Sequence, residues 1–111
     1  AKIVYDFKYP VLINDDDFTT FFVKNTKELF GDDSIHEISV PTMGGEDMAY
    51  FLQKAQGTFF VLSNPIIHDG GKIYPHHSDR FDIDESLFYK GTSAVLATVL
   101  KYLDLGGYKD N

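Results

Sequence analysis

The sequence contains no cysteine and no tryptophan among its 111 residues, and Arg80 is its single arginine. Without cysteine there is no disulfide framework, no thiol nucleophile and no thiolate metal site. Acidic side chains outnumber basic ones, 17 to 10, and the formal net charge is −7. Because phosphate binding requires clustered lysine and arginine, we expect no nucleic-acid partner.

Long apolar runs are absent as well. No segment approaches the roughly 20 apolar residues that span a bilayer, and the N-terminal ten residues mix charged with apolar side chains, unlike a signal peptide. We therefore expect no membrane contact, and the lack of cysteine favours a cytoplasmic protein. The length allows one modest domain. The chain begins at Ala1 without methionine, which is typical either of an engineered or processed end or of a piece of a longer protein.

Two kinds of hydrophobic pattern alternate along the chain. Period-two alternation predicts strands over residues 2–9 and 35–40, and the continuous apolar run over 58–62 predicts a strand covered on both sides. Helical spacing predicts helices over about 15–30, 46–54 and 84–103. Strands that alternate with helices indicate an α/β fold.

The ends of the predicted helices carry residues with known roles. We expect Asn14 to cap the first helix and Gly31 to end it, while Gly106 and Gly107 end the last helix. The stretch 94–103 is apolar almost all round, so we expect it to be buried on more than one side.

The residues best suited to binding a metal ion are concentrated in the segment 74–85. It contains the adjacent histidines His76 and His77 and four carboxylates. Imidazole is a good ligand for zinc, manganese or nickel, and adjacent histidines on a loop point in different directions, so one of the two would reach a given ion. The alternative is a solvated polar loop whose Asp82 caps the last helix.

A second candidate site is the turn before the helix at 46–54. Gly44 and Gly45 let a ligand approach the backbone, and free amides there bind anions, but Glu46 and Asp47 at the same place repel an anion. The alternative is a structural turn in which the acidic residues serve the helix end or orient a neighbouring histidine.

Taken together, these segments resemble a known enzyme family. The chain reads PTMGGEDMAYFLQKAQGTFFVLSN and, after a loop, YPHHSDRFDIDESLFYKGTSAVLATVLKYL. The order and spacing are similar to the C-terminal part of the amidohydrolase branch of peptidase family M20, which includes hippurate hydrolases and N-acyl-amino-acid amidohydrolases. Upstream, YDFKYPVLINDDDFTTFF resembles the last strand of that family's lid domain and its return into the catalytic domain.

The resemblance implies a fold and a set of site residues. Residues 1–10 would be the last strand of a lid or dimerisation domain, and residues 11–111 the C-terminal portion of a zinc-peptidase-like α/β catalytic domain. His77 matches the family's metal ligand, with His76 as the fallback. Gly44 and Gly45 match a loop that approaches the substrate carboxylate, and Glu46 and Asp47 match an acidic pair with a positioning role.

The resemblance also implies a reaction that this segment does not complete. Two divalent ions (zinc, manganese, nickel or cobalt) would activate a water molecule that hydrolyses an N-acyl amino acid or a related amide or peptide, with no catalytic residue in the present segment. The partners would be that small molecule, the rest of the parent chain and further copies of the parent in a homo-oligomer. We expect the isolated chain to be inactive. The alternatives are a non-enzymatic interaction module and a small metal-binding domain centred on His76 and His77.

Overall fold

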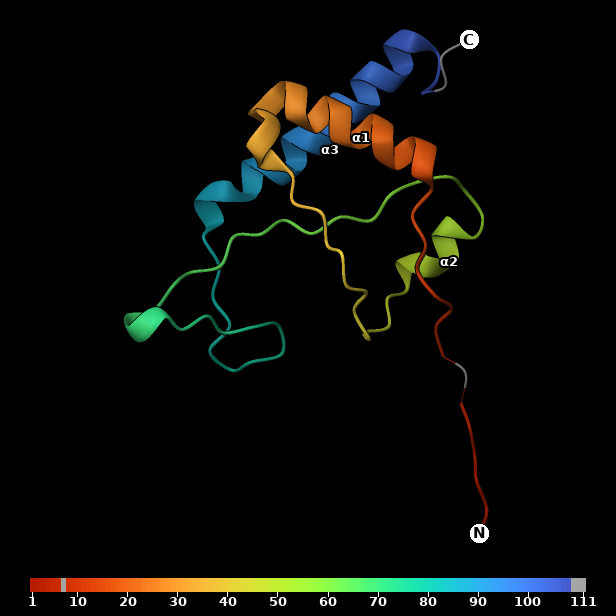
Figure 1. Cartoon of the computed structure of the whole chain (residues 1–111), viewed down its shortest axis with the longest axis vertical. Helices are drawn as coiled ribbons and strands as arrows, with labels where there is room; N and C mark the ends of the chain where they lie inside the picture. The colour runs from red at the N-terminus through yellow and green to blue at the C-terminus, as the bar shows by residue number, and fades with distance from the viewer. Residues whose placement is uncertain (7, 109–111) are drawn as a thin grey trace.

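Helices supply the regular secondary structure of this protein. The structure, a computed structural model, describes residues 1–6 and 8–108. Its α-helices are α1 (Asp16–Phe30), α2 (Met48–Leu52) and α3 (Phe88–Leu105), and its short 3-10 helices are η1 (Asp32–Ser34), η2 (Asp69–Gly71) and η3 (Glu85–Leu87). Figure 1 shows α1 lying across α3, with α2 apart from both.

Both the start of helix α1 and its N-cap lie one residue later than the sequence predicts. The side chain of Asp15 accepts a hydrogen bond from the backbone N–H of Phe18 at 2.8 Å, so Asp15 and not Asn14 is the N-cap. Asp16 and Asp17 follow in the first turn, where their charge complements the helix dipole. The helix ends at Gly31, as predicted; its φ of +93° is a conformation that favours glycine.

Helix α3 follows η3 without a break and packs against α1. Asp84 accepts a hydrogen bond from the N–H of Ser86 at 2.9 Å and thereby caps η3. At the other end Gly106 adopts a left-handed conformation, and the N–H of Gly107 donates to the carbonyl oxygen of Tyr102 at 2.9 Å. The predicted glycine end of this helix is therefore confirmed.

The predicted α/β fold, in which strands alternate with helices after a first strand at residues 1–10, is wrong for this structure. Among residues 1–6 and 8–108 there is no strand and no sheet; two isolated bridges, Pro65 with Ile83 and His68 with Lys72, are the only strand-like pairings. The segments 2–9, 35–40 and 58–62 form no ladder with one another, and Phe7, part of the first, lies outside the described residues. A strand needs a neighbour to pair its backbone groups, and alternation in a sequence predicts a buried face without supplying that neighbour.

The segment expected to be a covered strand packs instead on the start of α1. The N–H of Asp15 donates to the carbonyl oxygen of Gly57 at 3.0 Å, and the hydroxyls of Thr19 and Thr58 are 3.1 Å apart. The rings of Phe22 and Phe60 lie 4.6 Å apart between centroids. The apolar run at 58–62 therefore contributes long-range contacts without forming a strand.

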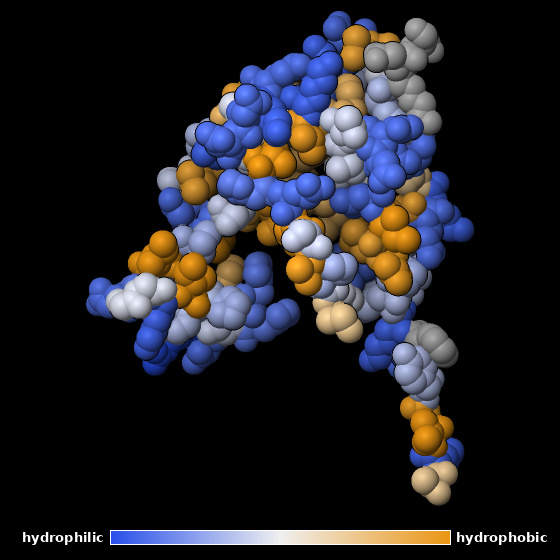
Figure 2. Space-filling model, in the orientation of Figure 1, coloured by the Kyte–Doolittle hydropathy of each residue, from blue (hydrophilic) through white to orange (hydrophobic). Residues whose placement is uncertain are grey.

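The packed core is small for a chain of this length. Its radius of gyration is 17.3 Å, whereas a compact domain of this size has one of about 13 Å. The buried apolar residues among those described are Phe21, Phe22, Ala49 and Ala94. Figure 2 shows hydrophobic surface at several separate places on one face, including the N-terminal arm.

Helix α3 is covered on one side only, which corrects the expectation of burial on several sides. Ala94 and Thr98 are buried, as are Phe21 and Phe22 of α1. The apolar side chains on the rest of α3 are 48–68% exposed: Val95, Leu96, Val99, Leu100 and Leu103. In the part of the chain that the structure describes, no helix combines the length and hydropathy of a membrane-spanning segment.

Candidate metal-binding loop

The segment between Asn64 and Asp84 forms a loop that is closed at its base. The N–H of Asp84 donates to the carbonyl oxygen of Asn64 at 2.8 Å, and the side-chain amide of Asn64 donates to the carbonyl oxygen of Asp84 at 3.2 Å. The antiparallel bridge between Pro65 and Ile83 adjoins these bonds. This part of the chain is thus a loop with defined ends.

Three smaller contacts lie inside the loop. A tight turn joins His68 to Lys72, where the N–H of His68 donates to the carbonyl oxygen of Lys72 at 2.9 Å. The guanidinium of Arg80 donates to the Tyr74 hydroxyl at 3.2 Å and lies 5.6 Å from the centre of that ring. The edge of the His68 ring also contacts Tyr74, with 5.0 Å between the centroids. Tyr74 therefore contacts both His68 and the single arginine.

Two consecutive turns present the histidine pair at the far end of the loop. The N–H of Ser78 donates to the carbonyl oxygen of Pro75 at 3.2 Å, and the N–H of Phe81 donates to the carbonyl oxygen of Ser78 at 3.1 Å. His77 is the third residue of the first turn and has a φ of +67°. Positive φ at the third position alone is typical of a type II turn, which favours glycine or asparagine there. Among the described residues His77 is the one non-glycine residue with positive φ.

The two histidines differ in their surroundings. The ring of His76 packs against that of Phe81, with centroids 4.7 Å apart and planes inclined by 32°. His77 is exposed, and its imidazole makes no hydrogen bond or ring contact with the described residues. Exposed neutral imidazole is a competent metal ligand. No cluster of three or more His, Asp or Glu side chains suited to a metal ion occurs within residues 1–6 and 8–108.

Two of the carboxylates near the histidines bond the backbone. Asp82 accepts a hydrogen bond from the adjacent N–H of Ile83 at 3.0 Å. Asp84, not Asp82, caps the turn that leads into α3, which corrects the alternative interpretation of this loop. Aspartate side chains commonly accept such bonds from nearby backbone N–H groups.

The glycine turn at the second candidate site packs against an aromatic ring. A Cβ atom added to Gly45 would lie 2.8 Å from Cδ2 of Tyr9, whereas one added to Gly44 would meet nothing within 4 Å. The ring of Tyr9 lies 6.1 Å from that of Tyr50, whose hydroxyl donates to the carbonyl oxygen of Lys8. Gly45 therefore allows the N-terminal segment to lie close to α2.

The acidic pair beside these glycines belongs to the start of α2. The carboxylate of Glu46 accepts a hydrogen bond from the N–H of Met48 at 3.2 Å, and Asp47 is exposed. Figure 1 shows the 74–82 turns as a loop of their own, separate from α2. The structure therefore does not bring Gly44, Gly45, Glu46 and Asp47 together with His76 and His77.

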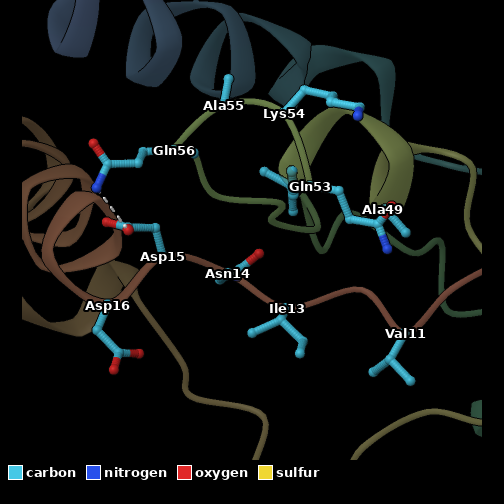
Figure 3. Close-up of a pocket in the computed structure, with 12 residues that line it drawn as sticks. Val11, Ile13, Asn14, Asp15, Asp16, Ala49, Gln53, Lys54, Ala55 and Gln56 are labelled. Atoms are coloured by element: carbon cyan, nitrogen blue, oxygen red, sulfur yellow. Dashed lines mark hydrogen bonds between the residues drawn. The ribbon is translucent and has the colours of Figure 1, made fainter.

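A cavity of about 640 Å³ lies between the segment before α1 and the end of α2. Val11, Ile13 and Lys54 are among its lining residues, and the side chain of Gln56 donates to Asp15 there at 3.1 Å (Figure 3). None of the site residues predicted from the sequence lines it. Sequence reasoning missed this cavity, because it forms between segments that are about 40 residues apart.

Comparison with known proteins assigns the chain to a family. Residues 1–101 match the model of peptidase family M20/M25/M40. The protein belongs to this family of hydrolases, which confirms the resemblance found in the sequence.

Curated relatives extend the comparison. The chain is 31% identical over 104 residues to a protein described as the putative amidohydrolase YhaA of Bacillus subtilis, a match that covers 94% of this chain and 26% of the relative. It is 33% identical over 94 residues to thermostable carboxypeptidase 1 of Saccharolobus solfataricus, covering 85% of this chain and 23% of that protein. The chain thus spans about a quarter of the length of these relatives. No solved structure matches it significantly.

Proposed function

We propose that this chain is the C-terminal part of a metal-dependent amidohydrolase that cleaves N-acyl amino acids or related amide and peptide bonds. Family membership over residues 1–101 supports the hydrolase class, and the names of the two relatives describe amide-bond and peptide hydrolysis. In this proposal residues 1–10 belong to a lid or dimerisation domain, and residues 11–111 belong to the catalytic domain.

His77 is the proposed metal ligand, and its backbone conformation is the observation that carries the proposal. Left-handed φ costs a non-glycine residue of the order of 1–3 kcal/mol and persists where the surroundings enforce it. The two turns from Pro75 to Phe81 enforce it here, and they place the imidazole at an exposed position. Glycine would relieve that strain but has no imidazole. His76 is the weaker candidate, since its ring packs on Phe81.

The metal chemistry requires groups beyond this chain. Two divalent ions, when bound, would polarise the amide carbonyl and lower the pKa of a water molecule; zinc, manganese, nickel and cobalt all accept imidazole. His77 would hold one of them through a ring nitrogen. Since the described residues contain no cluster of three suitable donors, the remaining ligands have to come from the rest of a longer chain.

The turn at Gly44 and Gly45 is the proposed substrate-binding segment. Gly44 is open on its side-chain face, so a substrate carboxylate can approach the backbone there. Glu46 holds the N–H of Met48 and thereby fixes the start of α2 beside that backbone, and exposed Asp47 completes the positioning pair.

We further propose that residues 1–111 alone are inactive and require the rest of the parent chain, which itself forms a homo-oligomer. The uncovered apolar face of α3 supports the need for a covering partner. The same face is compatible with a non-enzymatic interaction module, which differs in one respect: it binds a partner without hydrolysing an amide.

The experiment compares the complete protein in wild-type, His77→Ala and His76→Ala forms. Metal content and hydrolysis of an N-acetyl amino acid are measured for each. We expect His77→Ala to lose about 100-fold or more in kcat/KM together with bound metal, since ligand loss exceeds the 10–100-fold cost of losing an outer-shell partner. His76→Ala retains both. The opposite order would make His76 the ligand. If neither substitution changes metal content or kcat/KM, the loop is not part of the metal site. Hydrolysis by residues 1–111 alone would contradict the inactivity.

A further inference from the structure

We infer that Asn64 is a positioning residue for His77, acting through the base of the loop. This inference rests on the proposed function, because it concerns how the proposed ligand is held. Asn64 is 9% exposed and lies 13 residues before His77 in the sequence. It touches neither the histidines nor, in this proposal, the metal.

Asn64 forms hydrogen bonds with both the backbone N–H and the backbone carbonyl oxygen of Asp84, at the other end of the loop. Its carbonyl oxygen accepts from the N–H of Asp84, and its side-chain amide donates to the carbonyl oxygen of Asp84. Any residue at position 64 supplies the first bond. The second requires a short side chain with an N–H donor, which asparagine has and aspartate lacks.

Asp84 transmits this restraint to the helical part of the protein. Its carboxylate caps η3, which continues into α3, and α3 packs on α1. The loop is therefore attached at Asn64 to the most firmly packed part of the chain. The bond between the Asn64 amide and the Asp84 carbonyl oxygen is part-buried, and loss of such a bond costs free energy, so removal of the amide loosens the attachment.

His77 depends on this attachment because its conformation is strained. A residue at φ +67° keeps that conformation only while the surrounding structure enforces it. When the loop's ends separate, the turns from Pro75 to Phe81 can adopt other backbone conformations. The fraction of molecules with His77 correctly placed then falls. Apparent metal affinity falls by the same fraction.

The chain offers a matched control for this test. Asn14 also bonds a distant backbone in two directions: its side chain donates to the carbonyl oxygen of Phe59 at 3.0 Å and accepts from that residue's N–H at 2.8 Å. It lies at the start of α1, away from the loop. Asn14→Asp and Asn64→Asp each remove one amide donor from a comparable arrangement, so the difference between them isolates the effect on the loop.

The experiment measures cobalt(II) binding to the complete protein, with equilibrium affinity and the visible absorption spectrum as readouts. We expect Asn64→Asp to weaken cobalt binding about 10-fold, the lower end of the range for outer-shell partners, and to alter the absorption band. Asn14→Asp should leave both near wild type. Equal effects of the two variants, or an unchanged Asn64→Asp, would overturn the inference.

Two further measurements separate the possible failures. If His77→Ala binds cobalt normally, the proposed ligand is wrong, whatever Asn64 does. If His77→Ala loses cobalt while Asn64→Asp keeps it, His77 is still supported as the ligand, and the positioning role of Asn64 is wrong. Should Asn64→Asp not fold, hydrogen exchange in the wild type decides: the amide of Asp84 should exchange as slowly as those of α3. An Asp84 amide that exchanges as fast as the exposed loop would contradict the attachment.

Discussion

Asn14 and Phe59 pair in both directions although they are 45 residues apart: the Asn14 side chain donates to one backbone group of Phe59 and accepts from the other. One side chain thus satisfies both backbone hydrogen-bonding groups of Phe59, as a neighbouring strand would. Asp15 extends the pairing, because its N–H donates to the carbonyl oxygen of Gly57. These bonds hold the 56–60 segment against the start of α1.

The pairing predicts that Asn14→Ala is destabilising. Two hydrogen bonds are lost, each worth about 0.5–1.5 kcal/mol, so the free energy of unfolding should fall by about 1–3 kcal/mol. Urea denaturation measures it. Gln56→Ala is the control, because it removes the exposed bond to Asp15 and should cost less than about 0.5 kcal/mol. Equal costs for the two variants would show that the Asn14–Phe59 pairing adds nothing.

His77 should be the site of a conflict between stability and function. Its positive φ predicts that His77→Gly is more stable to urea than His77→Ala by about 1 kcal/mol, because glycine adopts this conformation without steric cost. Both variants lack the imidazole, so both should lose metal in the complete protein. A His77→Ala variant as stable as His77→Gly would show that the turn is relaxed.

The two glycines before α2 should respond differently to alanine. Gly45→Ala places a methyl group against Tyr9, which is 54% exposed and turns away, so the cost should be about 1 kcal/mol. Gly44→Ala meets no atom and should be neutral or stabilising by up to about 1 kcal/mol. Thermal unfolding compares them. If Gly44 lies beside the substrate as proposed, Gly44→Ala also raises KM in the complete protein.

The uncovered face of α3 predicts a contrast between the isolated chain and the complete protein. Leu100 is 57% exposed, so Leu100→Lys should change the stability of residues 1–111 by less than about 0.5 kcal/mol. In the complete protein, where we propose that this face is covered, the same charge should cost several kcal/mol or prevent folding. Urea denaturation of both forms gives the comparison, with Lys101→Glu on the exposed surface as the control. A complete protein that tolerates Leu100→Lys would mean that the face stays open.

Buried packing should depend most on Phe22. It is 5% exposed and its ring contacts Phe60, so Phe22→Ala should cost about 3–5 kcal/mol, and Phe22→Leu clearly less. Circular dichroism during urea denaturation measures the loss of α1 and α3. A mild effect of Phe22→Ala would show that the contact between the helices and the 58–62 segment is dispensable.

Local features of this protein follow from the sequence alone. Helix α1 lies where the apolar spacing and Gly31 predict it, and α3 ends at the predicted glycines. The order of residues around His77 also reveals the family, as the match over residues 1–101 confirms. These features depend on neighbours in sequence, and one segment contains all the information that they need.

Other features were decided only by the tertiary structure. Alternation at 2–9, 35–40 and 58–62 predicts strands, but a strand forms only beside another strand, and the described residues supply none. The Asn14 side chain bonds Phe59, 45 residues away, so Asp15 and not Asn14 caps α1. The loop closes at Asn64 because Asp84, 20 residues further along the chain, comes within hydrogen-bond reach. The sequence alone predicts His77 as a metal ligand, whereas its positive φ in the turn from Pro75 to Ser78 is seen only in the structure, because the sequence places no glycine or asparagine there to indicate it.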